Sequence, residues 1–501
     1  MRLRELAVAA GINPSKEDGD VEISGLRHDS RLIRPGELFF ALPGSRTDGN
    51  RHVKEACARG AAAIVSELKA PPPPALLPAR WLSAPDVTAA MGRMADRFFG
   101  HPSGAMTVVG VTGTNGKTTT TYLLESILCA AKASPGVIGT VDYRLSGQKI
   151  SPAPNTTPLS LELQRLLAAF RDGGATHACL EISSHALALK RVEEIDFDAA
   201  VFTNLSRDHL DFHKTTEDYL SAKARLFELL ASPANRKPGK VAAVNGDDPR
   251  HEALRRAARP LRPLFFGLGA GNDVRAEELR PTLAGSTFDL LWNGRRLKAE
   301  IRLPGEHNVY NALAAATAAL GLGLAPETVL SGLAALSRVP GRLEPICEGQ
   351  DFAVLVDYAH TDAALSCVLA HLARLPHRRI LTVFGCGGER DRGKRGPMGV
   401  AACRGSDLAV LTSDNPRRED PAGILADIVA GLKTAGLKNY TIEPDRGKAI
   451  ERAVSMALPG DIVLIAGKGH ESVQILRDRA IQFDDRKAAR AALRAARPRK
   501  R

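Results

Sequence analysis

A glycine-rich stretch that also holds a lysine and several threonines, residues 112–120, is the part of this sequence best suited to chemistry. An apolar, β-branched run precedes it, and a segment of helical composition, residues 118–131, follows it at once. The backbone N–H groups of such a loop, together with the start of the following helix, attract phosphate. Lys117 adds a positive charge, and the hydroxyl of Thr118 is suited to binding Mg²⁺. The pattern therefore predicts a loop that holds the phosphates of a nucleotide.

The loop departs in one position from the strict phosphate-loop motif, because Val111 stands where the motif has its first glycine. An ordinary glycine turn with a solvated Lys117 is therefore an alternative. The flanking strand and helix favour the phosphate loop, since they present the start of the helix to the anion.

Polar clusters follow five predicted strands, each at the point where the strand ends. In open parallel sheets, ligands bind beyond the carboxyl ends of the strands. A single polar cluster at such a place has helix capping as an alternative explanation, whereas several clusters at equivalent ends indicate a shared site. The clusters are residues 181–185, 204–211, 357–360, 414–417 and 467–471.

Two residues in these clusters are candidate metal ligands. Glu181 follows a buried strand, and a carboxylate beside bound phosphates commonly holds Mg²⁺. Capping of the next helix is the alternative for Glu181. His209 lies between Asp208 and Asp211, which favours a second metal ligand over a purely structural histidine. Lys223, in an amphipathic helical segment, has the pattern of an ordinary surface lysine.

The elements that would position these residues fall into three segments. Residues 1–102 read as a small α/β unit, and residues 103–337 alternate strands and helices around the phosphate loop. Within the second segment, residues 264–303 become strand-rich and antiparallel, with Asn293-Gly294 as a hairpin turn. Residues 338–501 form a third series of short buried strands separated by helices, which predicts a doubly wound sheet.

Composition limits the class of protein. At 501 residues the chain is expected to hold about two to four domains, and its 44% apolar content permits sizeable cores. No apolar run approaches the ~18 residues of a membrane span, and the N-terminus has no signal-peptide core. The seven cysteines form no Cys-x-x-Cys pair, which argues against a disulfide framework or a zinc site and predicts a reducing cytoplasm.

The net charge of +12 suggests nucleic acid binding, but its distribution argues against that interpretation. Residues 487–501 carry seven Lys and Arg and no acid, which is more than half of the net charge. We expect this basic tail to be a helix end that frays into a solvated extension and is dispensable for activity. Aromatic residues make up only 5% of the chain, so stacking surfaces for single strands are not evident. No nucleic acid partner is therefore expected.

The phosphate loop and four further stretches resemble the Mur ligases, the cytoplasmic enzymes that build peptidoglycan precursors. The four stretches are residues 181–187, 203–211, 385–391 and 414–417, and with the loop they span all three segments in order. Within the family they are most similar to the member that adds the third amino acid. The resemblance implies an α/β protein of three domains: an N-terminal domain for the UDP moiety, a central ATPase domain with a phosphate-loop sheet, and a C-terminal Rossmann-like domain for the incoming amino acid.

The resemblance also implies a reaction. ATP phosphorylates the γ-carboxylate of D-Glu in UDP-N-acetylmuramoyl-L-alanyl-D-glutamate, and the amine of meso-2,6-diaminopimelate then attacks the acyl phosphate and releases phosphate. ATP and Mg²⁺ are the expected cofactors, because the anionic carboxylate and the anionic nucleotide repel each other. The protein is expected to act in the cytoplasm, as a monomer, without a membrane span or a nucleic acid partner.

Family roles carry over to residues that match the motifs. Lys117, Glu181, His209 and Lys223 match catalytic residues, and the family carbamylates the last of these, which makes it an anionic ligand of a second metal. The implied metal ligands are Thr118, Glu181, His209 and the carbamate of Lys223. The implied nucleotide contacts are Gly113, Thr114, Asn115, Gly116, Lys117, Thr118, Thr119, His307, Asn308, Asn311, Arg342 and Asp357.

Two further sets belong to the other substrates. Implied contacts to the UDP-linked substrate are His28, Ser30, Ser45, Arg46, Thr47, Asn155, Thr156, Thr157, Ser183 and Arg191. Implied contacts to diaminopimelate are Arg390, Asp414, Asn415, Pro416, Arg417, Gly467 and Glu471. The chain departs from some relatives at Leu189, where they carry Gln, so a hydrogen bond to substrate is lost or replaced there.

The choice of diaminopimelate over L-lysine depends on the extra carboxylate of diaminopimelate. Arg417 can hold that carboxylate with two parallel hydrogen bonds, Asn415 can add a donor, and Glu471 can accept from the neighbouring ammonium. Arg390 can hold a second carboxylate. The alternative for Arg417 is a role in capping its own loop.

Three other functions are alternatives. The homologue that adds L-lysine and folylpolyglutamate synthetase share the ATP loop, but the Asp-Asn-Pro-Arg sequence at residues 414–417 and the Ser30-Arg31 region favour the peptidoglycan enzyme. The third, a different class, is a phosphate-loop switch or a nucleic-acid-dependent NTPase that uses the basic tail. Turnover that needs RNA or DNA but no amino acid would distinguish it.

Overall fold

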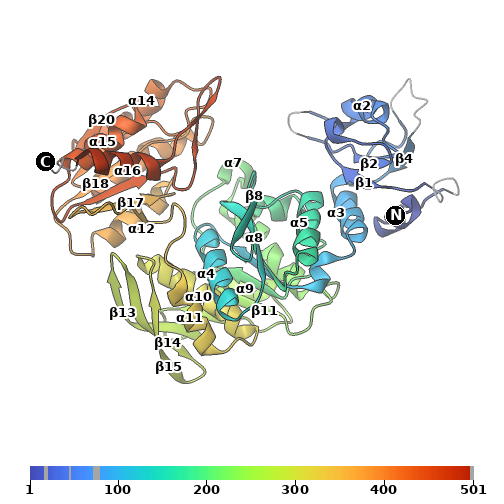
Figure 1. Cartoon of the computed structure of the whole chain (residues 1–501), viewed down its shortest axis with the longest axis horizontal. Helices are drawn as coiled ribbons and strands as arrows, with labels where there is room; N and C mark the ends of the chain where they lie inside the picture. The colour runs from blue at the N-terminus through green and yellow to red at the C-terminus, as the bar shows by residue number, and fades with distance from the viewer. Residues whose placement is uncertain (16–20, 45–46, 72–78, 497–501) are drawn as a thin grey trace.

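The computed structural model of this chain describes residues 1–15, 21–44, 47–71 and 79–496. It contains three sheets of four or more strands, each built from one stretch of the chain. In Figure 1 the N-terminal part lies at the right, the C-terminal part at the left, and the central part below and between them. Helices and parallel strands alternate in all three parts, which confirms the predicted α/β class.

The N-terminal part is a parallel sheet of four strands in the order β1-β2-β3-β4. Its strands are β1 (Gly25–Arg27), β2 (Glu37–Phe40), β3 (Ala63–Ser66) and β4 (Arg80–Ser83). Its α-helices are α1 (Leu3–Ala9), α2 (Val53–Ala58) and α3 (Val87–Phe98). The short 3₁₀ helices are η2 (Ser30–Leu32) and η3 (Gly49–His52).

The central part is an eleven-stranded sheet with β5 near its middle. Its strands are β5 (Thr107–Thr112), β6 (Pro135–Ile138), β7 (Asp142–Leu145), β8 (Gln148–Pro152), β9 (His177–Glu181), β10 (Ala199–Phe202), β11 (Val241–Asn245), β12 (Leu264–Gly267), β13 (Val274–Thr282), β14 (Gly285–Trp292) and β15 (Arg295–Ile301). The helices are η4 (Pro102–Ala105), α4 (Lys117–Ala130), α5 (Ser160–Asp172), α6 (Ser184–Ala188), α7 (Leu210–His213), α8 (Thr216–Ala231), α9 (His251–Ala257), α10 (Glu306–Gly321) and α11 (Pro326–Ala335).

Strand β5 is apolar because both faces of the sheet are covered. Val109 and Val111 belong to one core cluster, and Val108 belongs to the cluster on the other face. Strands β9 and β10 flank β5 in parallel register, so their carboxyl ends lie beside the end of β5. The sheet therefore brings the polar residues that follow β5, β9 and β10 to one edge.

The prediction of an antiparallel region over residues 264–303 is correct from β13 onward and wrong for β12, which pairs parallel with β11 and β13. Strands β13, β14 and β15 pair antiparallel, and Trp292 lies opposite Arg295 across a two-residue turn. Asn293 and Gly294 in that turn have φ of 48° and 75°, the left-handed conformation that such turns require.

The C-terminal part is a six-stranded sheet in the order β16-β17-β21-β18-β19-β20. Its strands are β16 (Glu344–Pro345), β17 (Ala353–Asp357), β18 (Ile380–Phe384), β19 (Leu408–Leu411), β20 (Tyr440–Ile442) and β21 (Ile462–Ala466), and β22 (Val473–Ile475) and β23 (Ala480–Gln482) form a separate hairpin. The helices are α12 (Asp362–Leu372), η5 (Arg392–Lys394), α13 (Arg395–Gly405), α14 (Pro421–Thr434), α15 (Arg446–Met456) and α16 (Asp485–Ala496).

This sheet is covered on both faces, as the prediction of a doubly wound sheet requires. Leu355 of β17 packs in the cluster that includes α12, α13 and α14, whereas Val354 and Val356 pack in the cluster that includes α15 and α16. Strands β17, β21, β18, β19 and β20 are parallel, so their carboxyl ends meet at one edge.

The basic tail is helical, as predicted, but the prediction that it frays into a solvated extension is wrong up to residue 496. Helix α16 packs into the core through Ala489, Ala492 and Leu493, all at most 5% exposed. Its arginines also have an acidic partner, since Arg490 and Arg494 both pair with Glu348. The composition of the tail concealed its amphipathic spacing, because small alanines form the buried stripe. Residues 497–501 lie outside the described part of the chain.

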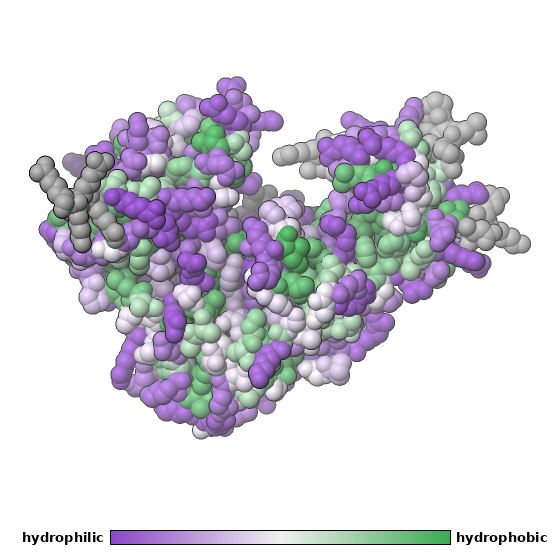
Figure 2. All heavy atoms as spheres, in the orientation of Figure 1, coloured by the Kyte–Doolittle hydropathy of each residue, from purple (hydrophilic) through white to green (hydrophobic). Residues whose placement is uncertain are grey.

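Figure 2 shows the same face with all atoms drawn, and the two upper lobes leave a broad hollow above the central part. Hydrophilic residues cover much of the outer surface of both lobes in this view. Across the described ranges, no helix combines the length and apolar character needed to cross a membrane.

Candidate active site

The loop after β5 is shaped by its glycines. Gly113 and Gly116 have φ of 146° and 89°, and Gly116 is the N-cap of α4. A side chain at Gly113 would collide with the hydroxyl of Thr203, and one at Gly116 would collide with the side-chain oxygen of Asn311. The loop therefore fits closely against the end of β10 and against α10, with the start of α4 open to an anion.

Lys117 folds back onto this loop. Its Nζ donates to the carbonyl oxygens of Gly113 at 2.8 Å and of Thr114 at 2.9 Å. Burial lowers the pKa of Lys117, and the nearby carboxylates of Glu181 and Asp208 oppose that shift. An anion that enters beside the loop would meet an ammonium that is already desolvated and held at fixed points.

Glu181 ends β9, and its carboxylate, in a residue 1% exposed, accepts three hydrogen bonds. The donors are the hydroxyl of Thr118 at 3.0 Å and the hydroxyl and N–H of Thr140, both at 2.9 Å. The capping alternative is wrong, because the residue that caps α6 is Ser183, which accepts from the N–H of Ala186 at 3.2 Å.

The donor set around Thr118 suits a hard cation. A hydroxyl and a carboxylate are oxygen ligands, and Mg²⁺ is usually held by one or two carboxylates together with water and substrate phosphates. No cluster of three or more His, Cys, Asp or Glu that could hold a metal occurs among the described residues. The residues present therefore fit Mg²⁺ that is held jointly with a nucleotide, and do not fit a metal held by the protein alone.

His209 lies on the wall between two cavities, close to Asp208, whose carboxylate is 3.5 Å from its Nε2. Burial lowers the pKa of His209 to about 4, although Asp208 opposes the shift. A neutral imidazole keeps the lone pair that metal ligation requires.

Lys223 is buried, which corrects the prediction of a surface lysine. The residue is 1% exposed, and its Nζ donates to the carbonyl of Gly113 at 2.7 Å and lies 4.4 Å from the centre of the Tyr219 ring. Burial and the charge of Lys117 hold its pKa well below the usual value. The helical spacing carried this signal, since Lys223 lies on the same face of α8 as Tyr219, Phe227 and Leu230.

The nucleotide residues implied by the resemblance line one cavity of about 530 Å³. Gly113 is the exception, since its carbonyl accepts from Lys117 and Lys223 and the residue does not line the cavity. The residues brought together there are Thr114, Asn115, Gly116, Lys117, Thr118, Thr119, His307, Asn308, Asn311, Arg342 and Asp357. The sequence analysis missed further residues that line the cavity, among them Asn245, Asp247, Asp248, Pro249, Tyr310, Ala364, Cys367 and Val368.

Two of the implied nucleotide contacts in this cavity, Arg342 and Asp357, come from the C-terminal part. Arg342 donates to the hydroxyl of Thr118 at 3.3 Å, and its guanidinium lies 4.5 Å from the centre of the Tyr358 ring. Asp357 accepts from the N–H of Leu343 at 2.7 Å and of Ala359 at 2.8 Å. Burial raises the pKa of Asp357, and Arg342 opposes the shift.

A second cavity of about 450 Å³ adjoins the first. Asp208, His209, Tyr358 and His360 line both cavities, so the two share a wall. Of the residues implied to contact diaminopimelate, Pro416 does not line it. The residues that do line it are Arg390, Asp414, Asn415, Arg417, Gly467 and Glu471.

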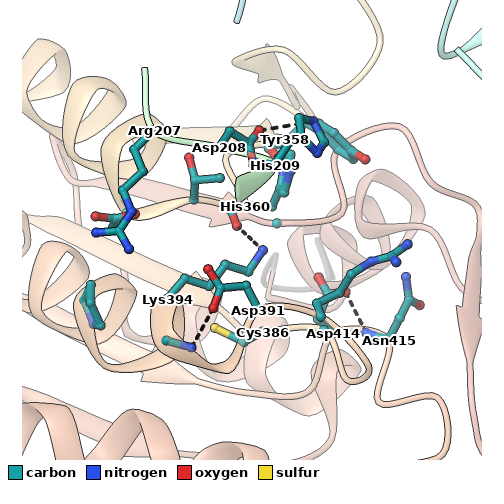
Figure 3. A pocket seen from close by; sticks show the side chains of 18 of the residues that line it. Arg207, Asp208, His209, Tyr358, His360, Cys386, Asp391, Lys394, Asp414 and Asn415 are labelled. Atoms are coloured by element: carbon teal, nitrogen blue, oxygen red, sulfur yellow. Dashed lines mark hydrogen bonds and ion pairs between the residues drawn. The ribbon is translucent and has the colours of Figure 1, made fainter. Parts of the chain in front are cut away.

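Figure 3 shows this second cavity with Arg207, Asp208 and His209 on one side and Asp414 and Asn415 on another. Further charged groups that the sequence analysis did not single out also line it. Lys394 donates to the carbonyl of His360 at 2.9 Å, and Asp391 accepts from the N–H of Gly393 at 2.8 Å.

Arg417 has φ of 54°, and its Nη1 donates to the carbonyl of Gly388 at 2.7 Å. The side chain therefore bonds its neighbouring loop and lines the cavity at once. The structure is consistent with both the capping alternative and a role toward a ligand.

The implied contacts to the UDP-linked substrate are dispersed. His28 and Asn155 line a third cavity of about 430 Å³ between the N-terminal and central parts. Ser30 is buried instead and donates to Glu55 at 2.7 Å, and Thr47 bonds His52. Ser45 and Arg46 lie outside the described residues.

The remaining residues of that set lie near the central sheet edge. Thr156 lines the nucleotide cavity, and Thr157 donates to the carbonyl of Glu181 at 2.8 Å. Arg191 donates to the carbonyl of Thr157 at 2.9 Å, which places it beside Ser183 and the end of β9. Leu189, the position of the departure from some relatives, is 43% exposed.

Family models match most of the chain. The Mur ligase family catalytic domain matches residues 22–99, the Mur ligase middle domain matches residues 111–319, and the Mur ligase glutamate ligase domain matches residues 341–469.

Individual proteins match over nearly the whole length. The UDP-N-acetylmuramoyl-L-alanyl-D-glutamate--2,6-diaminopimelate ligase of Solibacter usitatus is 48% identical, over 95% of this chain and 94% of its own. The protein of the same name from Geobacter metallireducens is 44% identical, over 99% of this chain and 98% of its own. A solved structure of a ligase of that name is 34% identical, covers 99% of both chains and has a TM-score of 0.69. The chain therefore belongs to the Mur ligase family and has its three-domain architecture.

Proposed function

We propose that this chain is the ATP-dependent ligase that joins meso-2,6-diaminopimelate to UDP-N-acetylmuramoyl-L-alanyl-D-glutamate. The observation that carries the proposal is the shared wall of the two large cavities. One cavity contains the phosphate loop, and the other is lined by separate cationic and anionic side chains, as a zwitterionic amino acid requires. Relatives more than 40% identical over nearly the whole chain bear the name of this activity, which supports the same proposal.

In the first step, the γ-carboxylate of D-Glu attacks the γ-phosphorus of ATP, and ADP leaves. Lys117 and the start of α4 hold the phosphates and offset the repulsion between two anions. Thr118, Glu181, His209 and the carbamate of Lys223 would hold Mg²⁺. When bound, Mg²⁺ supplies charge neutralisation and polarisation of the transferred phosphoryl group.

In the second step, the amine of the amino acid attacks the acyl carbon across the shared wall. A C–N bond forms, the amine loses a proton, and the C–O bond to phosphate breaks. Holding both reactants in adjoining cavities makes this attack effectively intramolecular. Arg417 and Asn415 would hold the distal carboxylate of diaminopimelate, Glu471 its ammonium, and Arg390 a second carboxylate.

The remaining parts of the proposal concern location and organisation. We place domain boundaries at residues 102–103 and 337–338, so that the N-terminal domain holds the UDP moiety near His28 and Asn155. The chain acts as a cytoplasmic monomer in peptidoglycan precursor synthesis.

Two alternatives within the class predict different substrates. An L-lysine ligase would leave Arg417 without a partner for its charge, and a folylpolyglutamate synthetase would not need the third cavity near His28. Phosphate release measured with UDP-N-acetylmuramoyl-L-alanyl-D-glutamate, ATP and a panel of amino acids tests all three. Release that depends on both the UDP substrate and meso-diaminopimelate is the expected result. Release with L-lysine alone, or with a folate and glutamate, would reject the proposal.

A further inference from the structure

A fully buried lysine lies beneath the second cavity. Lys468 follows β21 by two residues, and its side chain is 0% exposed. Its Nζ is 3.0 Å from the side-chain oxygen of Asn415, 3.0 Å from Oε2 of Glu471 and 2.7 Å from the carbonyl of Val473. An ammonium has three N–H donors, so each donor has its own acceptor. Lys468 does not line the cavity, whereas Asn415 and Glu471 do.

These contacts fix the orientation of the Asn415 amide. Its Oδ1 accepts from Lys468 and from the backbone N–H of Ile475 at 2.9 Å, and neither of these groups can accept a hydrogen bond. A flipped amide would place its NH₂ group against both donors. The amide nitrogen therefore points the other way and donates to Oε2 of Glu471 at 2.8 Å.

The arrangement leaves one hydrogen-bond acceptor and one hydrogen-bond donor for a ligand. Among the described residues, Oε1 of Glu471 and the second N–H of Asn415 have no hydrogen-bond partner. Lys468 offsets the charge of Glu471 on the Oε2 side. A donor next to an acceptor of this kind matches the carboxylate and ammonium of one α-amino acid group.

Lys468 also joins three segments of the chain. Val473, its third acceptor, begins β22, and the next residue, Gln474, donates to the carbonyl of Asp414 at 2.7 Å. The N–H of Arg417 in turn donates to the carbonyl of Ile475 at 3.0 Å. The hairpin of β22 and β23 is thereby connected to the loop after β19, with the lysine at the junction.

We propose that Lys468 is a positioning residue that prepares the second cavity for the zwitterionic end of its amino acid, by fixing Asn415 as donor and Glu471 as acceptor. The inference rests on the proposed function, because it assigns this cavity to the incoming amino acid. It adds a residue that touches no ligand, and it predicts that selectivity for a second α-amino acid group depends on that residue.

The test replaces the ammonium while keeping the length of the side chain. Lys468→Met is expected to raise KM for meso-diaminopimelate about tenfold or more, and to lower its kcat/KM relative to L-lysine by a similar factor. The KM for ATP should stay within about twofold, because Lys468 is not part of the nucleotide cavity. Lys468→Gln keeps two donors and is expected to give an intermediate KM for diaminopimelate.

A matched control is available at the opposite end of the same sheet. Asp461, with a fully buried side chain, precedes β21 and pairs with Arg379 at 2.6 Å. Asp461→Asn also disturbs a buried charge of this domain, so it is expected to lower the melting temperature without changing KM for diaminopimelate.

The outcomes separate this inference from the proposed function. A wild-type protein that does not use diaminopimelate overturns the proposed function. With an active wild type, a folded Lys468→Met variant with unchanged KM and selectivity overturns the inference. An equal rise in KM in Asp461→Asn overturns it as well, because the effect would then be general loosening of the domain. If both Lys468 variants fail to fold while Asp461→Asn folds, the lysine is structural and the inference fails.

Discussion

Arg446 and Asp485 form a buried ion pair with two parallel hydrogen bonds, both 2.7 Å long, and neither side chain is exposed. Arg446 also donates to the carbonyl of Ala466 at 2.9 Å and of Ser413 at 3.3 Å. Ala466 directly precedes Gly467, and Ser413 directly precedes Asp414, and both Gly467 and Asp414 are proposed diaminopimelate contacts. Asp485, the first residue of α16, is therefore linked through Arg446 to the residues that line the second cavity.

Removing the last helix is expected to destabilise the protein. Truncation after Arg486 deletes the buried Ala489, Ala492 and Leu493, and burial of such side chains contributes several kcal/mol. Urea unfolding should show the loss, and turnover should fall with it. The control is truncation after Ala496, which removes only residues 497–501, beyond the described part of the chain, and is expected to change neither. Normal stability in the shorter truncation product would show that α16 does not hold the domain together.

Breaking the buried ion pair of Arg446 and Asp485 is expected to lower the free energy of unfolding more than breaking an ion pair at the surface. Asp485→Ala leaves the charge of Arg446 buried without a partner, which costs about 3–5 kcal/mol. Glu348→Ala removes the partner of Arg490 and Arg494 at the surface, where such pairs contribute much less to stability. Chemical denaturation of both variants gives the comparison directly. Equal losses in the two variants would contradict the energetic difference between these pairs.

The sequence predicted the positions of the strands well, because buried parallel strands are short apolar runs that end at polar residues. Val108 to Val111 is such a run, and Ile462 to Ala466 is another. The same rule placed Glu181 and Asp414 at the sheet edges where the cavities lie. The local sequence therefore predicted which residues lie at the end of each strand, beside a cavity.

What the sequence could not predict depends on contacts between distant segments. The lining of the nucleotide cavity combines Asp247 with Tyr310, whose hydroxyl donates to that carboxylate at 2.9 Å. Lys468 bonds Asn415, in the loop after β19, and Val473, in β22, so its neighbours in sequence carry no sign of its burial. Such pairs are set by the packing of strands and helices that lie far apart in the chain.

Lys117→Ala is expected to abolish ligation while the fold persists. The ammonium lies beside the phosphate loop in a desolvated site, where loss of a positioned charge costs several kcal/mol of transition-state stabilisation. The rate should fall by two or more orders of magnitude. Phosphate release and a thermal melt measure activity and folding separately. Lys433→Ala, at the exposed end of α14, is the control and should be fully active. A folded Lys117→Ala protein with near-normal turnover would reject the phosphate-loop assignment.

Lys223 is expected to act as a carbamate. An ammonium beside metal ions would repel them, whereas a carbamate offers the oxygen ligand that hard cations prefer. Burial lowers the pKa of Lys223, and the neutral amine is the form that combines with CO₂. Lys223→Ala and Lys223→Arg should both lose activity, since neither can form a carbamate. Wild-type protein stripped of CO₂ should lose activity that added bicarbonate restores.

The contrary results for Lys223 are equally specific. Full activity of Lys223→Ala at ordinary Mg²⁺ concentration would exclude any need for the side chain. Activity of Lys223→Arg together with inactivity of Lys223→Ala would show that a cation, not a carbamate, is required at this place.

The choice of amino acid is expected to depend on Arg417. Diaminopimelate differs from L-lysine by one carboxylate at the far end of the side chain, and Arg417 lines the cavity that would receive it. With L-lysine the guanidinium would lack a partner, at a cost of about 2–4 kcal/mol, or roughly 30- to 1000-fold in kcat/KM. Wild-type protein should therefore use diaminopimelate and discriminate strongly against lysine.

The ratio of kcat/KM for diaminopimelate to kcat/KM for lysine distinguishes binding of the distal carboxylate by Arg417 from capping of its own loop. Arg417 donates to the carbonyl of Gly388, so Arg417→Ala removes a loop contact as well as a possible carboxylate contact. If Arg417 binds the distal carboxylate, the variant loses kcat/KM for diaminopimelate far more than for lysine, because only diaminopimelate has that group. If the arginine only caps its loop, both substrates lose equally. The adjacent, exposed Arg418 provides the control, and Arg418→Ala should leave the ratio unchanged. Equal or better use of lysine by the wild type would reject the diaminopimelate specificity and leave membership of the ligase family unaffected.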